Sequence, residues 1–137
     1  MMTLPEYLQW AMKQPWGWGS EVGLDCCKFA GKWAIVCGYV DPMVLVWSGK
    51  GYNSETSALR RIHEGGGLVS LWSEGMDHAD MPAAIGEPEA GDIGVIKRAT
   101  VCGGNQALGI YTGQRWVTLA LAGIEAGPAD ILKAWRP

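Results

Sequence analysis

The sequence predicts an α+β fold in which N-terminal helices pack on a small antiparallel β-sheet. Up to residue 74, apolar residues recur at helical spacing between glycine-rich breaks. After Gly91, short runs of β-branched and apolar residues are bounded by turn residues. Helices first and strands second is the order typical of α+β domains. A length of 137 residues fits one domain, and we expect that domain to span residues 1–137.

Start and stop signals divide the first half into four expected helices. Thr3 and Glu6 form a capping-box pattern, in which each side chain caps the other's backbone. Asp25 and Ser54 are favourable N-cap residues for two further helices. The predicted helices are 4–13, 26–37, 55–64 and 68–74, and residues 75–91 are expected to form a long loop.

The pattern in the last third of the sequence predicts three strands and a short helix. The strands are 93–96, 107–112 and 116–121, and Gly113-Gln114 is a plausible hairpin turn between the last two. Pro128 is a favourable first residue of a helix. Because Ile131, Leu132 and Trp135 follow it at helical spacing, we expect the chain to close with a short helix.

Composition excludes some functions and points towards a partner. Charged residues make up only 18% of the chain, against about 25% in typical soluble domains, and the chain has eight tryptophans. Part of this apolar surplus is expected to cover a partner, with two or three tryptophans at an interface. The net charge is −3 and no basic run exceeds two residues, which excludes a phosphate-binding stripe and argues against nucleic acid as a partner.

The sequence also leads to expectations about compartment and redox state. The N-terminus has no pattern of a secretory signal, and the longest apolar stretch, 33–47, is interrupted too often to cross a bilayer. We therefore expect a protein that is made in the cytosol and has no membrane span. The four cysteines are accordingly expected to be reduced.

One segment could carry chemistry, namely Leu24 to Phe29. Cys26 lies in the first turn of an expected helix, where unpaired N–H groups and the helix dipole favour a thiolate. This is where a cysteine nucleophile is normally placed. A small buried side chain near a helix start explains the same residue equally well, so these residues alone leave both interpretations open.

The order of several short motifs resembles a known family. A helix-borne Asp-Cys, a later Gly-Asp that opens a strand, and a Gly-Ile-Tyr strand resemble the papain-like NlpC cell-wall peptidases. The resemblance is closer to a phage and prophage tail-associated family built on that fold, and it covers about nine-tenths of the chain. The matching segments here are Pro15–Gly19, Asp25–Trp33, Asp41-Pro42, Tyr52, Gly66–Leu68, Gly91-Asp92 and Ala134–Arg136.

This resemblance implies a papain-like, NlpC-type core and a role in the tail tip or baseplate of a bacteriophage, prophage or gene-transfer particle. The expected partners are other tail proteins, such as hub or tail-tip components, with peptidoglycan as a further possible ligand. The implied location is the host cytoplasm during assembly, and then the virion tail. Such peptidases have a cysteine nucleophile and a histidine base. Carried over to this chain, the nucleophile position is Cys26 and the base position is Ala107. Since alanine cannot accept a proton, the resemblance implies a structural pseudoenzyme.

The alternative is an active cell-wall peptidase with Cys26 as nucleophile and an unrecognised base. His78, in the polar segment 76–80 that we expect to be a loop, is the substitute base to consider. His63, near the expected end of a helix, is explained by the helix dipole.

A third possibility is a metal-binding assembly factor. The cysteines form no C-x-x-C pair, and Cys26 and Cys37 would be roughly 16 Å apart along a helix axis. We therefore expect neither a metal ion nor a cofactor. Trp16 and Trp18 are the candidate partner-binding residues, one expected to pack inside the domain and the other to be exposed or in contact with a partner.

Overall fold

The computed structural model spans residues 1–137 and describes all of them except 1, 19–22, 44–51, 99–104 and 121–122. In the described part, helices precede strands along the chain, as the sequence predicts. The helices are α1 (Leu4–Met12), α2 (Cys26–Val36), α4 (Glu55–Glu64) and α5 (Leu68–His78). The strands are β1 (Ile93–Lys97), β2 (Gln106–Tyr111), β3 (Trp116–Ala120), β4 (Gly123–Gly127) and β5 (Asp130–Trp135).

The five strands form one antiparallel sheet in the order β4-β3-β2-β1-β5. Strands β2, β3 and β4 follow one another as hairpin neighbours. The chain then returns to the opposite edge of the sheet, where β5 pairs with β1. The register of this last pair shifts at Val95 and Ile96, which face Lys133 and Ile131, so that Leu132 is the extra residue of a β-bulge.

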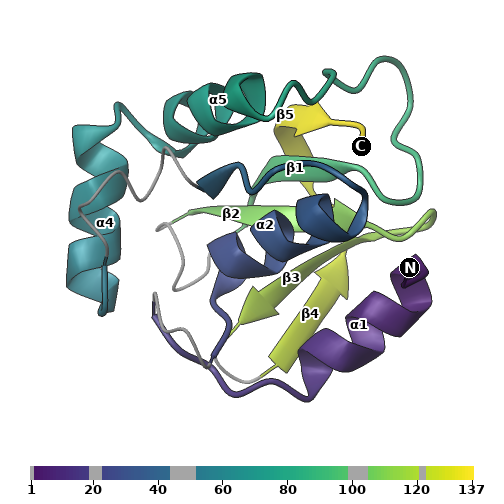
Figure 1. The fold of residues 1–137 in the computed structure, drawn as a ribbon, viewed down its shortest axis with the longest axis horizontal. Helices are drawn as coiled ribbons and strands as arrows, with labels where there is room; N and C mark the ends of the chain where they lie inside the picture. Colours follow the sequence, from purple (N-terminus) through teal and green to yellow (C-terminus); the bar gives the residue numbers. More distant parts are fainter. Residues whose placement is uncertain (1, 19–22, 44–51, 99–104, 121–122) are drawn as a thin grey trace.

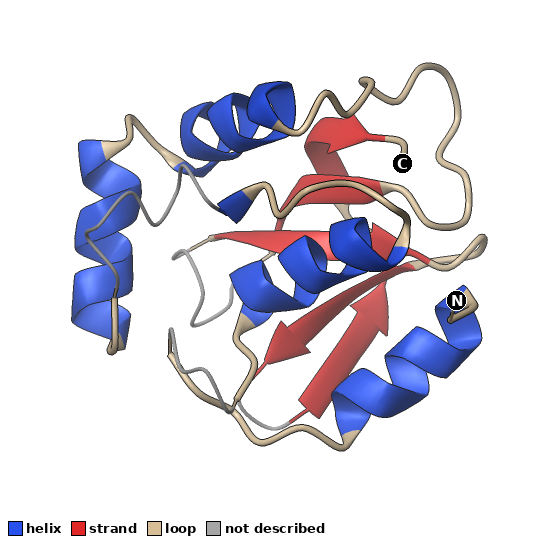
Figure 2. Cartoon of the chain, in the orientation of Figure 1, coloured by secondary structure: helices blue, strands red, loops and turns tan. Residues whose placement is uncertain are grey.

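Helix α2 crosses one face of the sheet and contacts β2 and β3, as Figure 1 shows. Helix α5 packs against β5, and α4 packs on α5 beyond the edge of the sheet. Figure 2 shows the same division into a helical part and a sheet, with a long connection between α5 and β1. The core lies between α2 and the sheet and contains aromatic residues from both parts, among them Phe29, Trp72 and Trp135.

The predicted N-caps are confirmed. The Thr3 hydroxyl accepts from the Glu6 N–H at 3.3 Å, and the Glu6 carboxylate accepts from the Thr3 N–H at 3.0 Å. Asp25 caps α2 and Ser54 caps α4, whose bounds agree with the predicted 55–64. These helix starts are predictable because their capping bonds are local in the sequence.

Two predictions at element ends are wrong. The fourth helix continues to His78, so the expected loop 75–91 begins four residues later. Gly75 lies inside this helix because its missing side chain allows close approach to the Pro42 backbone; a Cβ there would lie 2.3 Å from the Pro42 carbonyl oxygen. A packing contact therefore explains a glycine that resembles a helix stop in the sequence.

The predicted C-terminal helix is also wrong, because residues 130–135 form strand β5. The open edge of β1 offers this segment a full ladder of backbone hydrogen bonds. A helix of six residues has little stability of its own in water. Pairing with a preformed sheet edge therefore overrides the helical spacing of Ile131, Leu132 and Trp135, of which only Trp135 is buried.

Candidate functional site

The start of α2 is positioned by the strand-like segment that precedes it. The Gly17 N–H donates to the Leu24 carbonyl at 3.1 Å, and the Leu24 N–H donates to the Pro15 carbonyl at 2.9 Å. Asp25 then ends the extended segment and accepts from the Lys28 N–H at 2.8 Å. The residues Asp25, Cys26 and Cys27 are all buried, so the N-terminus of this helix lies inside the domain.

Cys26 lies in the first helical turn, as predicted, but it is not a free thiol. Its side chain is completely buried and the residue is disulfide-bonded. Cys27 and Cys37 are free thiols, and Cys102 lies outside the described residues. The prediction of four reduced cysteines is therefore wrong for Cys26, because it rested on the expected compartment and not on which side chains the fold brings together.

Cys27 is a buried thiol beside two aromatic side chains. Desolvation raises the pKa of this thiol well above its usual range, and the nearby Asp25 charge raises it further. Interactions with the Trp72 indole and the Tyr52 hydroxyl lower the pKa by less. The thiol therefore stays protonated at neutral pH and is a poor nucleophile.

Tyr52 connects this thiol with the helix cap. Its hydroxyl donates to the second carboxylate oxygen of Asp25 at 2.8 Å. Burial, followed by the proximity of Cys27 and Asp25, raises the pKa of Tyr52. Trp72 completes the cluster: it is fully buried, and its indole N–H has no well-aligned hydrogen-bond acceptor in the described part of the structure.

The space beside Cys27 is small. A cavity of about 10 Å³ is lined by apolar side chains and by Cys27, Tyr52 and Arg61. This is room for about one water molecule. Among the described residues, the cavity offers no cleft in which a peptide substrate could approach the Cys27 sulfur.

Ala107, the expected base position, is the second residue of β2 and is fully buried opposite Ile96 of β1. Helix α2 and strand β2 lie side by side and begin at the same end of the molecule (Figure 1). The fold thus brings the two predicted positions to the same end of a contacting helix and strand. Their side chains provide a bonded sulfur and a methyl group.

The two histidines lie elsewhere on the molecule. His78 is the last residue of α5, not a loop residue, and its side chain is exposed, whereas Cys26 is completely buried. His63 is exposed near the end of α4. The described structure therefore gives neither histidine the position of a base against Cys26.

Trp16 and Trp18 form a perpendicular aromatic pair, with ring centroids 5.1 Å apart. Both are half-buried, so the expected division into one packed and one exposed residue is not seen. Trp18 lines the small cavity beside Cys27, and Trp16 pairs with Leu24 through a short backbone bridge. Both tryptophans thus help to close the region around the start of α2.

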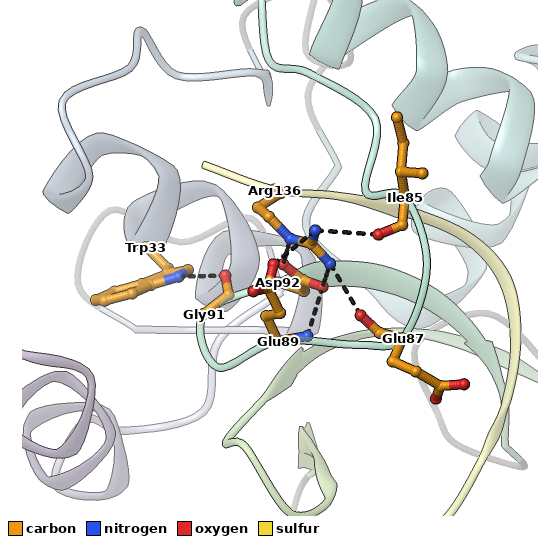
Figure 3. A network of polar contacts seen from close by, with 7 residues as sticks. All are labelled: Trp33, Ile85, Glu87, Glu89, Gly91, Asp92 and Arg136. Atoms are coloured by element: carbon orange, nitrogen blue, oxygen red, sulfur yellow. Dashed lines mark hydrogen bonds and ion pairs between the residues drawn. The ribbon is translucent and has the colours of Figure 1, made fainter.

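The Gly-Asp and Ala-Trp-Arg motifs meet in a polar network, which the sequence did not predict (Figure 3). Asp92 is 1% exposed, and its two carboxylate oxygens accept from Arg136 Nε and Nη2, each at 2.9 Å. The Glu89 N–H also donates to Asp92. The Arg136 guanidinium further donates to the carbonyls of Ile85 and Glu87, both at 3.1 Å, and forms an ion pair with Glu89.

This network holds separate segments of the chain together. It fastens the long α5–β1 connection to the end of β5, and the Trp33 indole N–H of α2 donates to the neighbouring Gly91 carbonyl at 2.9 Å. Hydrogen bonding to Asp92 is the main reason that the pKa of Arg136 is raised. A charged pair at such separated positions, 92 and 136, could be found in the sequence only through the motifs that carry them.

A metal site and a membrane span would each leave a signature in the described residues. No three or more His, Cys, Asp or Glu side chains of these residues gather where they could hold a metal ion. None of the described helices combines the length and the apolar character needed to cross a bilayer.

The described residues form an α+β domain, in which N-terminal helices precede a five-stranded antiparallel sheet. The chain belongs to the family described as "Domain of unknown function (DUF6950)", whose model matches residues 2–137. Comparisons with curated proteins and with solved structures give no significant match.

Proposed function

We propose that this protein is a structural component of the tail tip or baseplate of a bacteriophage, prophage or gene-transfer particle, built on a degenerate, NlpC-like cysteine-peptidase fold. The observation that carries the non-catalytic part is the state of Cys26. Its sulfur is fully buried and already bonded, and the position expected to supply the base is Ala107.

The other sulfur near the helix start does not replace it. A cysteine nucleophile acts as a thiolate in a partly exposed, electropositive environment. Cys27 has a raised pKa, a buried side chain and the Asp25 carboxylate as its neighbour. The cavity beside it has a volume of about 10 Å³, room for about one water molecule and far too small for a peptide cross-link.

The tail-tip part of the proposal is supported by the sequence resemblance and by the surface. The resemblance extends over the Asp-Cys, Gly-Asp and Ala-Trp-Arg motifs, which come from three separate segments of the sequence. Exposed apolar side chains remain on the described surface, among them Met12, Val40 and Ile85. A particle component must bury surface of this kind against its neighbours.

The catalytic alternative is tested on purified protein with isolated peptidoglycan, with and without a thiol reductant. The parent chain is compared with Cys26→Ala, and Cys37→Ala is a matched control that removes a free, partly buried thiol. We expect no Cys26-dependent release of peptide fragments under either condition. Release that needs a reductant and is lost only in Cys26→Ala would overturn the non-catalytic assignment in favour of a peptidase.

The assembly role is tested in the strain that produces the particle. Trp18→Ala and Cys26→Ala are compared for particle yield, infectivity and presence of the protein in purified particles. A structural role predicts that Trp18→Ala reduces assembly, whereas Cys26→Ala affects assembly only as far as it lowers stability. Normal particles that adsorb but fail to deliver DNA in Cys26→Ala would instead indicate an enzyme. Wild-type yield and infectivity without the gene would contradict the tail role.

A further inference from the structure

The α5–β1 connection displays one large apolar side chain to solvent. Ile85 is 83% exposed, well above the other exposed large apolar residues of the described part, the next being Met12 at 64%. In Figure 3 its side chain points away from the Arg136 network. In the isolated molecule this side chain gains nothing from burial, so it is available for contact with a second surface.

The backbone around Ile85 is nevertheless firmly held. Arg136 donates to the Ile85 carbonyl and to the Glu87 carbonyl, both at 3.1 Å. On the preceding side, the Ala84 N–H donates to the Ala134 carbonyl of β5 at 3.0 Å. A side chain presented by an ordered backbone loses little conformational entropy when it enters a pocket, so this connection is preorganised for contact.

An apolar groove that could receive such a side chain lies between α1 and α2. Its volume is about 220 Å³, and it is lined by Met2, Tyr7, Trp10, Lys32, Ile35 and Val36. Met2 and Ile35 are 37% and 46% exposed, so the groove is open to solvent. A buried apolar cavity of about 150 Å³ accommodates a benzene ring, so this groove has room for the four carbons of an isoleucine side chain.

The charges beside the two features are complementary. Lys32 is the one charged residue among those that line the groove. Glu87 follows Ile85 by two residues, and in Figure 3 its carboxylate points away from Arg136. Across the described ranges, neither Lys32 nor the Glu87 carboxylate forms an ion pair within the chain. Each molecule thus carries an apolar knob and an acid on the same connection, and an apolar groove with a base among its lining residues.

We propose that this protein self-associates head to tail: Ile85 of one copy enters the α1–α2 groove of a second copy, and Glu87 faces Lys32 of that copy. Because the two surfaces differ, the contact is heterologous. It leaves one free knob and one free groove on every dimer, so that assembly continues to a ring or a filament. This inference stands apart from the proposed function, since it requires neither a phage particle nor a reaction.

The test begins with the mass of the purified chain measured by light scattering and sedimentation over a wide concentration range. The parent chain is expected to form oligomers whose mass rises with concentration. Ile85→Asp removes the knob and Ile35→Asp blocks the groove, and each should weaken association by roughly thirtyfold or more. Leu59→Asp is the matched control, because Leu59 is 39% exposed on α4, away from both surfaces, and this variant should associate like the parent.

Mixing the two variants gives the sharper result. Ile85→Asp keeps a working groove and Ile35→Asp keeps a working knob, so an equimolar mixture should form a one-to-one dimer that grows no further. The charge pair is tested in the same way: Lys32→Glu and Glu87→Lys should each weaken association, and the double variant should recover most of it.

Several results would overturn the proposal. A parent chain that stays monomeric at millimolar concentration has no such contact. Oligomers that persist unchanged in both aspartate variants are formed by another surface, and variants that fail to pair on mixing do not use the knob and the groove together. Far-ultraviolet circular dichroism shows whether each variant is folded, and both substituted positions are exposed enough to tolerate the change.

Discussion

The molecule contains two buried aspartates in contrasting surroundings. Asp92, at the start of the sheet, accepts two hydrogen bonds from a guanidinium and one from a backbone N–H. Asp25, at the start of α2, accepts from a backbone N–H and from the Tyr52 hydroxyl, with a protonated thiol close by. The first belongs to an ion pair, whereas the second accepts from the hydroxyl of a neutral tyrosine.

The difference shows what each region is suited to. A carboxylate held by a bidentate arginine fastens chain segments together with a defined geometry. A carboxylate beside Cys27 and Tyr52 adds to the effect of burial in raising the pKa of both groups, so the thiol and the phenol stay protonated at neutral pH. The first region fastens distant segments of the chain together, and the second holds a protonated thiol and a protonated phenol beside a helix N-cap.

The largest effect should come from Asp92→Ala. The substitution leaves the Arg136 guanidinium and the Glu89 N–H without their acceptor and releases the α5–β1 connection. We expect the free energy of unfolding to fall by about 3 kcal/mol, measured by urea denaturation. A loss no larger than that of an exposed control, Asp130→Ala, would show that the network does not stabilise the fold.

In the second region, Tyr52→Phe removes one donor from the buried Asp25 carboxylate without creating a cavity. The expected loss is about 2 kcal/mol, because a buried acceptor loses a hydrogen bond. Tyr111→Phe, at a half-buried tyrosine of β2, serves as the control and should change stability much less. Equal losses of stability in the two variants would show that the hydrogen bond from Tyr52 to Asp25 contributes nothing particular to the fold.

Alkaline pH should weaken the fold through Cys27. The thiol of the unfolded chain ionises near pH 9, whereas burial keeps the folded thiol protonated to higher pH. The contribution of the buried thiol to the free energy of unfolding is therefore complete below about pH 9. It falls as the pH rises further, by about 1 kcal/mol at pH 10. Urea denaturation at pH 7.5 and pH 10 measures the change, and Cys27→Ala should show a shallower decline. An identical pH dependence in parent and variant would contradict the raised pKa.

The smallest effect is expected for Trp72→Phe. The indole N–H of Trp72 is buried without a well-aligned acceptor among the described residues, so removing it sacrifices little hydrogen bonding, although some packing is lost. The free energy of unfolding should change by about 1 kcal/mol or less. By contrast, Trp33→Phe removes an indole that donates to the Gly91 carbonyl, and it should be the more costly of the two. The reverse order would indicate that Trp72 has a strong partner after all.

Local signals in the sequence predicted the parts of the fold that depend on local bonds. Thr3, Asp25 and Ser54 cap the helices that they were expected to cap, because a capping bond spans only three residues. The α+β order followed from spacing and turns, and the predicted strands 93–96, 107–112 and 116–121 agree with β1, β2 and β3 to within about one residue at each end. The papain-like assignment itself remains part of the proposal, since no solved structure matches the chain.

What the sequence could not supply depends on distant contacts. Residues 130–135 have a helical pattern, and only the free edge of β1 makes them a strand. At the site, the position of Cys26 was predictable from Asp25, but its disulfide was not, because a sequence does not show which sulfurs meet. Tyr52 and Trp72 were missed as neighbours of Cys27 because they lie 25 and more residues away along the chain, with no spacing signal to connect them.

The sheet order has a consequence for the chain as it leaves the ribosome. Strand β1 lies in the interior of the finished sheet, between β2 and β5, but its second neighbour is made only after β2, β3 and β4. Throughout that interval, four strands can pair in sequence while one side of β1 still presents its unpaired N–H and C=O groups. An open edge of this kind is a template for pairing with other chains. The last strand of the sheet therefore decides when β1 stops being able to pair with other chains.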